Sequence, residues 1–257
     1  MKNKLEDLID TLKILRSPNG CDWNQAQTHE TLIPYLLEEC HEVIEAIENK
    51  DYELLKEELG DLLLHIIFQA ELADEKNHFN IYNLIFDINQ KLIRRKPHIF
   101  PNSNNKQKKE HWEITKKNEK NRKSVLEGVP KSLPSLTKAR RIQEKAAGVG
   151  FDWDDLDKVF KKINEEIDEL KEAIDTKQKS KIQDELGDVI FSVVNLSRHI
   201  ECDPELSLNK STKKFISRFQ KLESYMENSN SNIKKKSLEE LEEVWNIIKN
   251  QSNLGSD

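Results

Sequence analysis

The residues best able to carry chemistry are carboxylates that recur at a fixed spacing. The pattern E-E-x-x-E at 165–169 is followed, after fifteen intervening residues, by E-x-x-D at 185–188. The same two patterns, at the same separation, stand at 38–42 and 58–61. Such a repetition indicates that one arrangement of acids occurs twice in the chain.

Helical geometry predicts that the acids of each half converge. At 100° per residue, two acids flank the apolar stripe of the first helix and two flank that of the second. Residues equidistant from the turn of an antiparallel helix pair lie level, so we expect four carboxylates to meet in each half. In the second half they are Glu166, Glu169, Glu185 and Asp188, and in the first half Glu39, Glu42, Glu58 and Asp61.

Converged carboxylates predict a metal site. Four partly buried carboxylates repel one another unless cations lie between them. Oxygen ligands without histidine or thiolate favour Mg²⁺, with Mn²⁺ as a substitute. Mg²⁺ held in this way completes its shell with water and substrate phosphates, which predicts a phosphoanhydride substrate. The alternative interpretation is a solvated helix face paired with lysines, but this gives no reason for the acids to flank the core.

The elements that must position these acids are helices joined by short loops. In the second half we expect helices over about 157–174, 180–200 and 208–227, and a fourth from Ser237. Asp154 or Asp155 is the expected N-cap of the first helix, and a capping box from Ser180 is expected to begin the second. Gly60 and Gly187, inside the acidic helices, are expected to leave room for close helix approach.

Composition predicts an all-α fold of two tandem helical-bundle domains. The chain has 257 residues, 34% of them charged, and only 7 Gly and 7 Pro, which suits amphipathic helices. One constant repeat offset, which places position 38 on 165 and position 58 on 185, aligns the two halves and indicates a duplicated domain. We expect one domain over 1–124, including a basic linker over about 96–124, and a second over 125–257.

Several classes of protein are disfavoured. The longest apolar run, LLLHIIF at 62–68, is far shorter than the roughly 20 residues of a membrane span. The first residues lack the continuous apolar core of a signal peptide. Three cysteines without a C-x-x-C pair suit a reducing cytoplasm, and a net charge of −6 gives no reason to expect nucleic acid as a partner.

At this point the motifs point to a family. The tandem acids, together with GCDWNQAQTHETL, EELGDLL, KLIRRKPHIF and VGFDW, closely resemble the two-domain MazG proteins, which are nucleoside triphosphate pyrophosphohydrolases of the all-α NTP pyrophosphatase superfamily. The resemblance implies domains that form a homodimer, and Mg²⁺ on the four acids. It also implies cleavage of an NTP or dNTP between the α and β phosphates to give NMP and pyrophosphate.

The resemblance also implies nucleotide contacts in the second half. Glu165 is expected to orient the attacking water, and Lys181 is expected to share the charge of the leaving group with Lys214 and Arg218. Trp245 is suited to stacking on a base. The implied nucleotide-binding residues are Lys162, Glu165, Glu166, Lys181, Asp188, Lys214, Arg218 and Trp245.

The two halves are not equivalent. Tyr35 and Leu54 stand where the second half has Lys162 and Lys181, so the second half is the expected principal catalytic centre. The first half is the expected site of a second, weaker metal.

Two alternative functions remain open at this point. One is a helical regulator that binds nucleotides without cleaving them. The other is a di-iron bundle, because Glu38–His41 and Glu75–His78 fit its E-x-x-H pattern.

Overall fold

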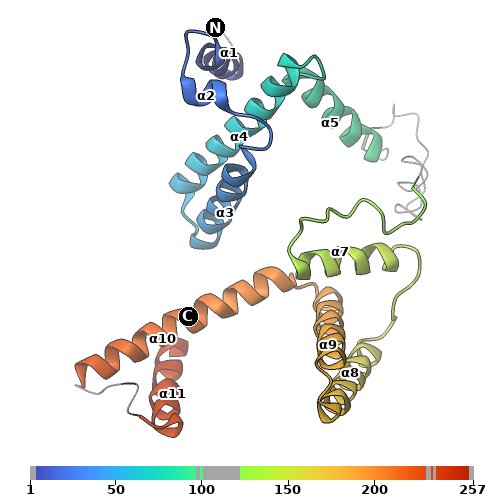
Figure 1. Cartoon of the computed structure of the whole chain (residues 1–257), viewed down its shortest axis with the longest axis vertical. Helices are drawn as coiled ribbons and strands as arrows, with labels where there is room; N and C mark the ends of the chain where they lie inside the picture. Colours follow the sequence, from blue (N-terminus) through green and yellow to red (C-terminus); the bar gives the residue numbers. More distant parts are fainter. Residues whose placement is uncertain (1–3, 97–98, 101–121, 230–232, 234–235, 255–257) are drawn as a thin grey trace. The chain divides into compact units, whose positions relative to one another are not determined.

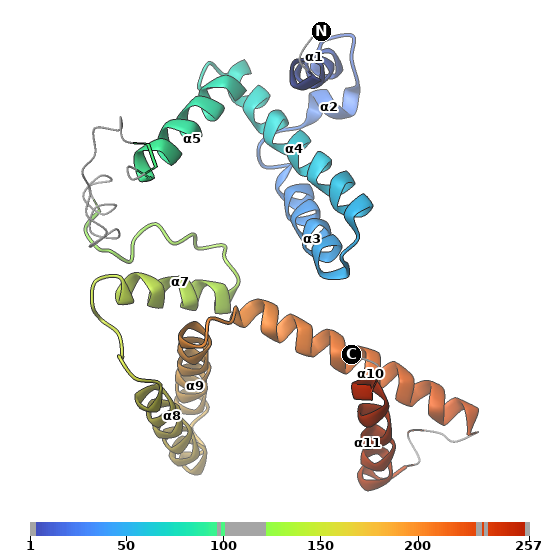
Figure 2. The ribbon, with the colours of Figure 1, turned by 180° about the vertical axis from the view of Figure 1, so that it is seen from behind.

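The computed structural model describes residues 4–96, 99–100, 122–229, 233 and 236–254. These residues form α-helices joined by loops and contain no β-strand, which confirms the all-α prediction. The chain divides into two compact units, residues 1–108 and 109–257. Figures 1 and 2 show the helices of both units. Most of the expected basic linker lies outside the described residues.

Unit 1 is built around a pair of antiparallel helices. Its helices are α1 (Lys4–Arg16), α2 (Asp22–Ala26), α3 (Ile33–Asn49), α4 (Tyr52–Glu75) and α5 (Ile81–Arg95). Helices α3 and α4 lie side by side (Figure 1). The core sits where α1 meets the C-terminal half of α4, and it contains Leu12, Ile67 and Phe68, all 4% exposed or less.

Unit 2 repeats this helix pair and extends it. Its helices among the described residues are α7 (Ser135–Ala147), α8 (Leu156–Thr176), α9 (Lys179–His199), α10 (Pro204–Asn228) and α11 (Leu238–Leu254). Helix α8 packs along α9, α7 packs against α9, and α11 packs against α10. A small core of Leu222, Met226 and Ile248 fills the space between α10 and α11.

The turns of the two helix pairs confirm the internal repeat. Lys50 ends α3 with φ 56° and Lys177 ends α8 with φ 58°, so both lie in the left-handed region that commonly closes a helix. These two lysines correspond to each other at the repeat offset that aligns the acids. The two acidic pairs therefore share one turn geometry.

The expected helix starts are partly confirmed. The Asp155 side chain accepts a hydrogen bond from Asp157 N, and Ser237 and Glu240 bond reciprocally at the start of α11. The prediction of a capping box at Ser180 is wrong, because α9 begins at Lys179 and the N-cap residue Gln178 makes no side-chain capping hydrogen bond. Helix α10 begins at Pro204, four residues before the expected start, because proline suits the first helical turn.

Most of the apolar stripe that periodicity predicts on the second acidic helix is exposed on α9. Leu186, Ile190 and Val193 are 46–48% exposed, because α7 and α8 pack against other faces of α9. The expectation of close helix approach at Gly187 is also wrong within one chain, since a Cβ added there would meet nothing within 4 Å. The same holds for Gly60 in α4.

None of the described helices is both long enough and apolar enough to cross a bilayer.

Candidate active site

Three carboxylates of unit 2 converge between α8 and α9. One oxygen each from Glu166 on α8 and from Glu185 and Asp188 on α9 lies within 4.8 Å of the other two. Glu166 is only 7% exposed, whereas Asp188 lies at the surface. The geometry therefore brings together three of the four acids that helical phasing placed here. We call these three residues the unit 2 acid cluster.

The fourth acid, Glu169, borders the unit 2 acid cluster without joining it. It lies one turn beyond Glu166 on α8 and does not share the group of oxygens within 4.8 Å. Its pKa is raised above the ordinary glutamate value by burial, and further by the negative charges of Glu166 and Glu185. Glu169 is therefore close enough to experience the field of the cluster.

Lys162 is the basic residue that lies against these acids. Its Nζ is 2.7 Å from Glu166 Oε1 and 2.8 Å from Glu165 Oε1. These two partners, Glu165 first, raise the pKa of Lys162 well above its ordinary value, so the side chain is cationic at neutral pH. The lysine lies one turn before Glu166, as its spacing predicted.

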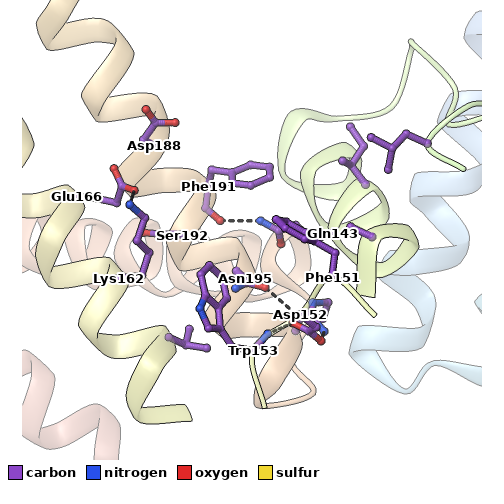
Figure 3. Close-up of a pocket in the computed structure, with 15 residues that line it drawn as sticks. Gln143, Phe151, Asp152, Trp153, Lys162, Glu166, Asp188, Phe191, Ser192 and Asn195 are labelled. Carbon is purple, nitrogen blue, oxygen red and sulfur yellow. Dashed lines mark hydrogen bonds and ion pairs between the residues drawn. The ribbon is translucent and has the colours of Figure 1, made fainter. Parts of the chain in front are cut away.

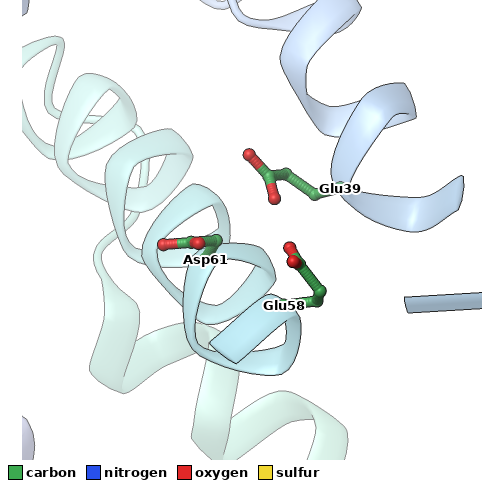
Figure 4. A group of neighbouring side chains, drawn as sticks. All are labelled: Glu39, Glu58 and Asp61. Carbon is green, nitrogen blue, oxygen red and sulfur yellow. The ribbon is translucent and has the colours of Figure 1, made fainter. Parts of the chain in front are cut away.

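Unit 1 contains a matching group of Glu39, Glu58 and Asp61 (Figure 4), which we call the unit 1 acid cluster. One oxygen of each again lies within 4.8 Å of the other two. Burial raises the pKa of Glu58, and the neighbouring charge of Glu42 raises it further. Burial and the charge of Asp61, in that order, raise the pKa of Glu39. Glu42 thus borders this cluster as Glu169 borders the other.

The remaining residues implied by the family resemblance lie on other helical surfaces. Lys181 is exposed in the first turn of α9, and Lys214 and Arg218 lie one turn apart on α10. Trp245 packs in the α10–α11 core, with its ring centroid 5.2 Å from that of Phe215. None of these four residues lines the cavity beside the unit 2 acid cluster, so their nucleotide contacts stay predictions.

A cavity of about 370 Å³ opens beside the unit 2 acid cluster (Figure 3). Lys162, Glu166 and Asp188 form one border of the cavity, and its remaining walls are mostly apolar. Gln143 and Asn195 lie in these walls at 8% and 6% exposure. Sequence reasoning missed both residues. The position of Asn195 within the apolar segment VIFSVVNL at 189–196 was the sequence signal available to find it.

A charged network fixes the loop that covers one end of the cavity. Asp152, in the F-D-W segment between α7 and α8, accepts a 2.8 Å hydrogen bond from Arg198 Nη1 on α9. His199 Nε2 lies 3.2 Å from the same carboxylate. Burial alone would raise the pKa of Asp152, but its hydrogen bonds with Arg198 and the charge of Arg198 bring it below its ordinary value. The loop that carries Trp153 is therefore tied to α9.

The coordinates do not favour the di-iron alternative. Neither acid cluster includes a histidine among the described residues. Glu75, the first residue of one E-x-x-H pattern, binds Arg16 through two hydrogen bonds of 2.6 and 2.8 Å. His41, the last residue of the other pattern, lies on an exposed face of α3.

Comparisons with known proteins match both halves of the chain. The family model for the MazG nucleotide pyrophosphohydrolase domain matches residues 27–100 and 155–223, which contain the two acid clusters. The nucleoside triphosphate pyrophosphohydrolase/pyrophosphatase MazG of Thermotoga maritima is 46% identical over 246 residues, covering 95% of each chain. The nucleoside triphosphate pyrophosphohydrolase of Escherichia coli K12 is 38% identical over 260 residues, covering 97% of this chain and 98% of the relative. The chain belongs to the MazG family, with the domain present twice.

Proposed function

We propose that the protein is a divalent-cation-dependent nucleoside triphosphate pyrophosphohydrolase. It cleaves an NTP or dNTP to NMP and pyrophosphate and serves nucleotide-pool housekeeping in the cytoplasm. The observation that carries the proposal is the convergence of three carboxylate oxygens within 4.8 Å inside the matched region of unit 2. The names of the two relatives support the reaction, and the three free cysteines support a reducing compartment.

The donor set of the unit 2 acid cluster fits a hard divalent cation. All its ligand atoms are carboxylate oxygens, which Mg²⁺ and Mn²⁺ prefer. Glu166, Glu185 and Asp188 would hold the ion, with Glu169 beside them. When bound, the ion supplies Lewis-acid stabilisation of the phosphoanhydride and of the pyrophosphate that leaves.

The side chains around the cluster bind and orient the reactants. Lys162, held cationic by its acidic partners, lies where it contacts a phosphate oxygen of the substrate. Glu165, bonded to Lys162 at 2.8 Å, orients the water whose oxygen forms a bond to the α-phosphorus. The bond from that phosphorus to the bridging oxygen breaks, the attacking water releases a proton to solvent, and the charge of the leaving pyrophosphate is shared by Lys181, Lys214 and Arg218. Trp245, which the family resemblance implies as a nucleotide contact, is the proposed stacking partner of the base.

Unit 2 is the proposed principal active site. At the repeat offset, Lys162 corresponds to Tyr35, so the unit 1 acid cluster lacks the lysine that pairs with Glu166. A second cation on Glu39, Glu58 and Asp61 would therefore have a binding role without an equivalent phosphate contact.

We propose that the enzyme works as a homodimer in which a second copy covers the exposed α9 stripe. Leu186, Ile190 and Val193 correspond at the repeat offset to Leu59, Leu63 and Ile66. All six side chains are 39–49% exposed in a single chain. Six large apolar side chains left at the same repeat positions are typical of a protein interface. The open space beside Gly187 supports the same conclusion.

Product analysis tests the reaction. Phosphorus NMR of ATP with the protein and Mg²⁺ should show NMP and pyrophosphate, whereas NDP and orthophosphate would contradict the assigned bond. We expect Asp188→Ala to lower kcat by at least about 100-fold, as loss of a metal ligand does. Asp61→Ala, the same change in unit 1, is the matched control and should retain most of the activity. Equal losses in the two variants would refute the assignment of unit 2.

A further inference from the structure

His65 is a buried histidine of unit 1 whose Nδ1 has no hydrogen-bond partner among the described residues. It lies on α4 and is only 9% exposed. Its other ring nitrogen, Nε2, lies 3.9 Å from Glu39 Oε1, a separation longer than a hydrogen bond. Buried polar groups of native proteins are nearly always paired, so this imidazole indicates a partner that the chain itself does not supply.

The Nε2 atom of His65 is directed toward the unit 1 acid cluster. Glu58, Asp61 and His65 lie at i, i+3 and i+7 on α4, which places them on one face of the helix. Glu39 approaches that face from α3 (Figure 4). Two atoms bonded to one ion at about 2.1 Å each are at most about 4.2 Å apart. The 3.9 Å between His65 Nε2 and Glu39 Oε1 therefore allows both atoms to bind the same ion.

The ring of His65 is suited to metal binding because it is neutral. Burial lowers the pKa of His65, and the charge of Asp61 opposes this effect only in part. The imidazole therefore carries a single proton at pH 7, and Nε2 can offer a lone pair. A neutral ring also leaves the mutual repulsion of the three carboxylates in place, and a bound ion would offset that repulsion.

Unit 2 provides an internal comparison. At the repeat offset His65 corresponds to Ser192, whose Oγ donates to a backbone carbonyl oxygen of its own helix at 2.9 Å. Glu39 corresponds to Glu166, which pairs with the cationic Lys162 at 2.7 Å. The unit 2 acid cluster thus offers oxygen ligands alone, whereas the unit 1 acid cluster has an imidazole nitrogen beside it.

We propose that His65 is a nitrogen ligand at the unit 1 acid cluster, and that this site binds a first-row transition-metal ion such as Co²⁺ or Zn²⁺ in preference to Mg²⁺. Imidazole suits these ions, whereas Mg²⁺ is held by oxygen ligands. The unit 2 acid cluster, with its oxygen ligands, remains the Mg²⁺ site. The inference rests on the proposed function, which assigns a cation to each cluster, and adds the ligand that makes the two ions differ.

The test uses electron spin-echo envelope modulation of bound Mn²⁺, which detects nitrogen bonded directly to the ion. Mn²⁺ accepts both oxygen and nitrogen ligands, so two equivalents fill both proposed sites. The wild-type full-length protein should show the modulation of one imidazole nitrogen, because the unit 2 acid cluster consists of carboxylates. His65→Gln, which places an amide oxygen where the nitrogen was, should lose this modulation. His78→Gln, at an exposed position of unit 1, is the matched control and should keep it.

Calorimetry of metal binding distinguishes a ligand from a residue that only supports the fold. For the wild type we expect one Co²⁺ per chain to bind at least about tenfold more tightly than Mg²⁺. His65→Gln should lower the affinity for this Co²⁺ by about ten- to a hundredfold and should change the Mg²⁺ affinities by less than about threefold. An equal loss of Co²⁺ and Mg²⁺ affinity would show a structural role for His65 and would overturn the proposal.

The outcomes also separate this inference from the proposed function. A wild-type protein that binds Mn²⁺ without nitrogen modulation would overturn the role of His65 while leaving the reaction of unit 2 intact, and this result needs no variant to fold. Nitrogen modulation that persists in a folded His65→Gln protein would equally overturn that role. A protein that binds no divalent cation and forms no NMP and pyrophosphate would overturn the proposed function, and this inference with it.

Discussion

Glu185→Gln is expected to stabilise the metal-free protein while weakening its response to Mg²⁺. The unit 2 acid cluster places an oxygen of Glu185 within 4.8 Å of oxygens of Glu166 and Asp188. Each such pair of charges repels by about 0.9 kcal/mol at the dielectric constant of water, and by about 3.5 kcal/mol at an effective value of about 20. Neutralising Glu185 removes two repulsive pairs without touching the Lys162–Glu166 ion pair. We take the lower figure for each pair. The two pairs together are then expected to raise the free energy of unfolding by about 2 kcal/mol.

The assay is thermal unfolding in EDTA and in excess Mg²⁺. A gain of about 2 kcal/mol corresponds to a rise in Tm of about 4–8 °C for a unit of this size. Mg²⁺ at a hundred times its Kd should stabilise the wild-type protein by about 2.7 kcal/mol per site, and Glu185→Gln should lose most of the unit 2 share. Because the unit 1 acid cluster also binds cations in this proposal, Glu58→Gln/Glu185→Gln should abolish the remaining response.

The control is Asp184→Asn, which removes a neighbouring exposed carboxylate of α9 that lies outside the cluster. This variant should unfold close to the wild-type Tm in EDTA and should keep the full Mg²⁺ shift. The reasoning is refuted if Glu185→Gln unfolds below the wild-type Tm in EDTA and the double variant still gains the full Mg²⁺ stabilisation.

Two further predictions concern pH and assembly. The folded-state pKa of Glu58 is raised above its ordinary 4.5, so its contribution to stability is present below that pH and is lost as the pH rises through the raised pKa. The Tm advantage of Glu58→Gln over the wild type in EDTA should therefore be absent near pH 4, grow above pH 4.5 and then level off; a shrinking advantage would contradict it. For assembly, light scattering should give twice the 30.1 kDa chain mass for the wild type and the single-chain mass for Ile190→Lys. A dimeric Ile190→Lys protein would exclude the α9 stripe as the interface.

The helix pairs and their acids could be predicted because they depend on local periodicity. The constant helical rise per residue fixes the distance between Glu166 and the turn at Lys177, and it also fixes the distance from that turn to Asp188. Counting from the turn therefore sufficed to bring these two acids level. The capping box at Ser180 failed because Thr176 Oγ1 accepts from Gln178 N, which ends the turn earlier.

The cavity beside the unit 2 acid cluster could not be predicted, because its walls depend on contacts between distant segments. Gln143 reaches Phe191 O across 48 residues of sequence, and Arg198 reaches Asp152 across 46. The periodicity of α7 and of α9 does not indicate that these two helices pack together. The apolar stripe of α9 could be predicted, because it follows from helical periodicity. Periodicity identifies an apolar face, but it does not indicate what packs against that face.

The two repeats share their converged carboxylates but differ in the residues beside them. Both repeats keep three converged carboxylates, and the unit 1 acid cluster keeps them without a lysine at position 35 to offset their repulsion. Such a cluster is costly to the metal-free fold, so its retention is most simply explained if a cation is bound there as well. Beside these acids, unit 2 has Lys162 and Asn195 at the positions that correspond to Tyr35 and Phe68 in unit 1. Under the proposed function, these differences are expected to confine nucleotide recognition to unit 2.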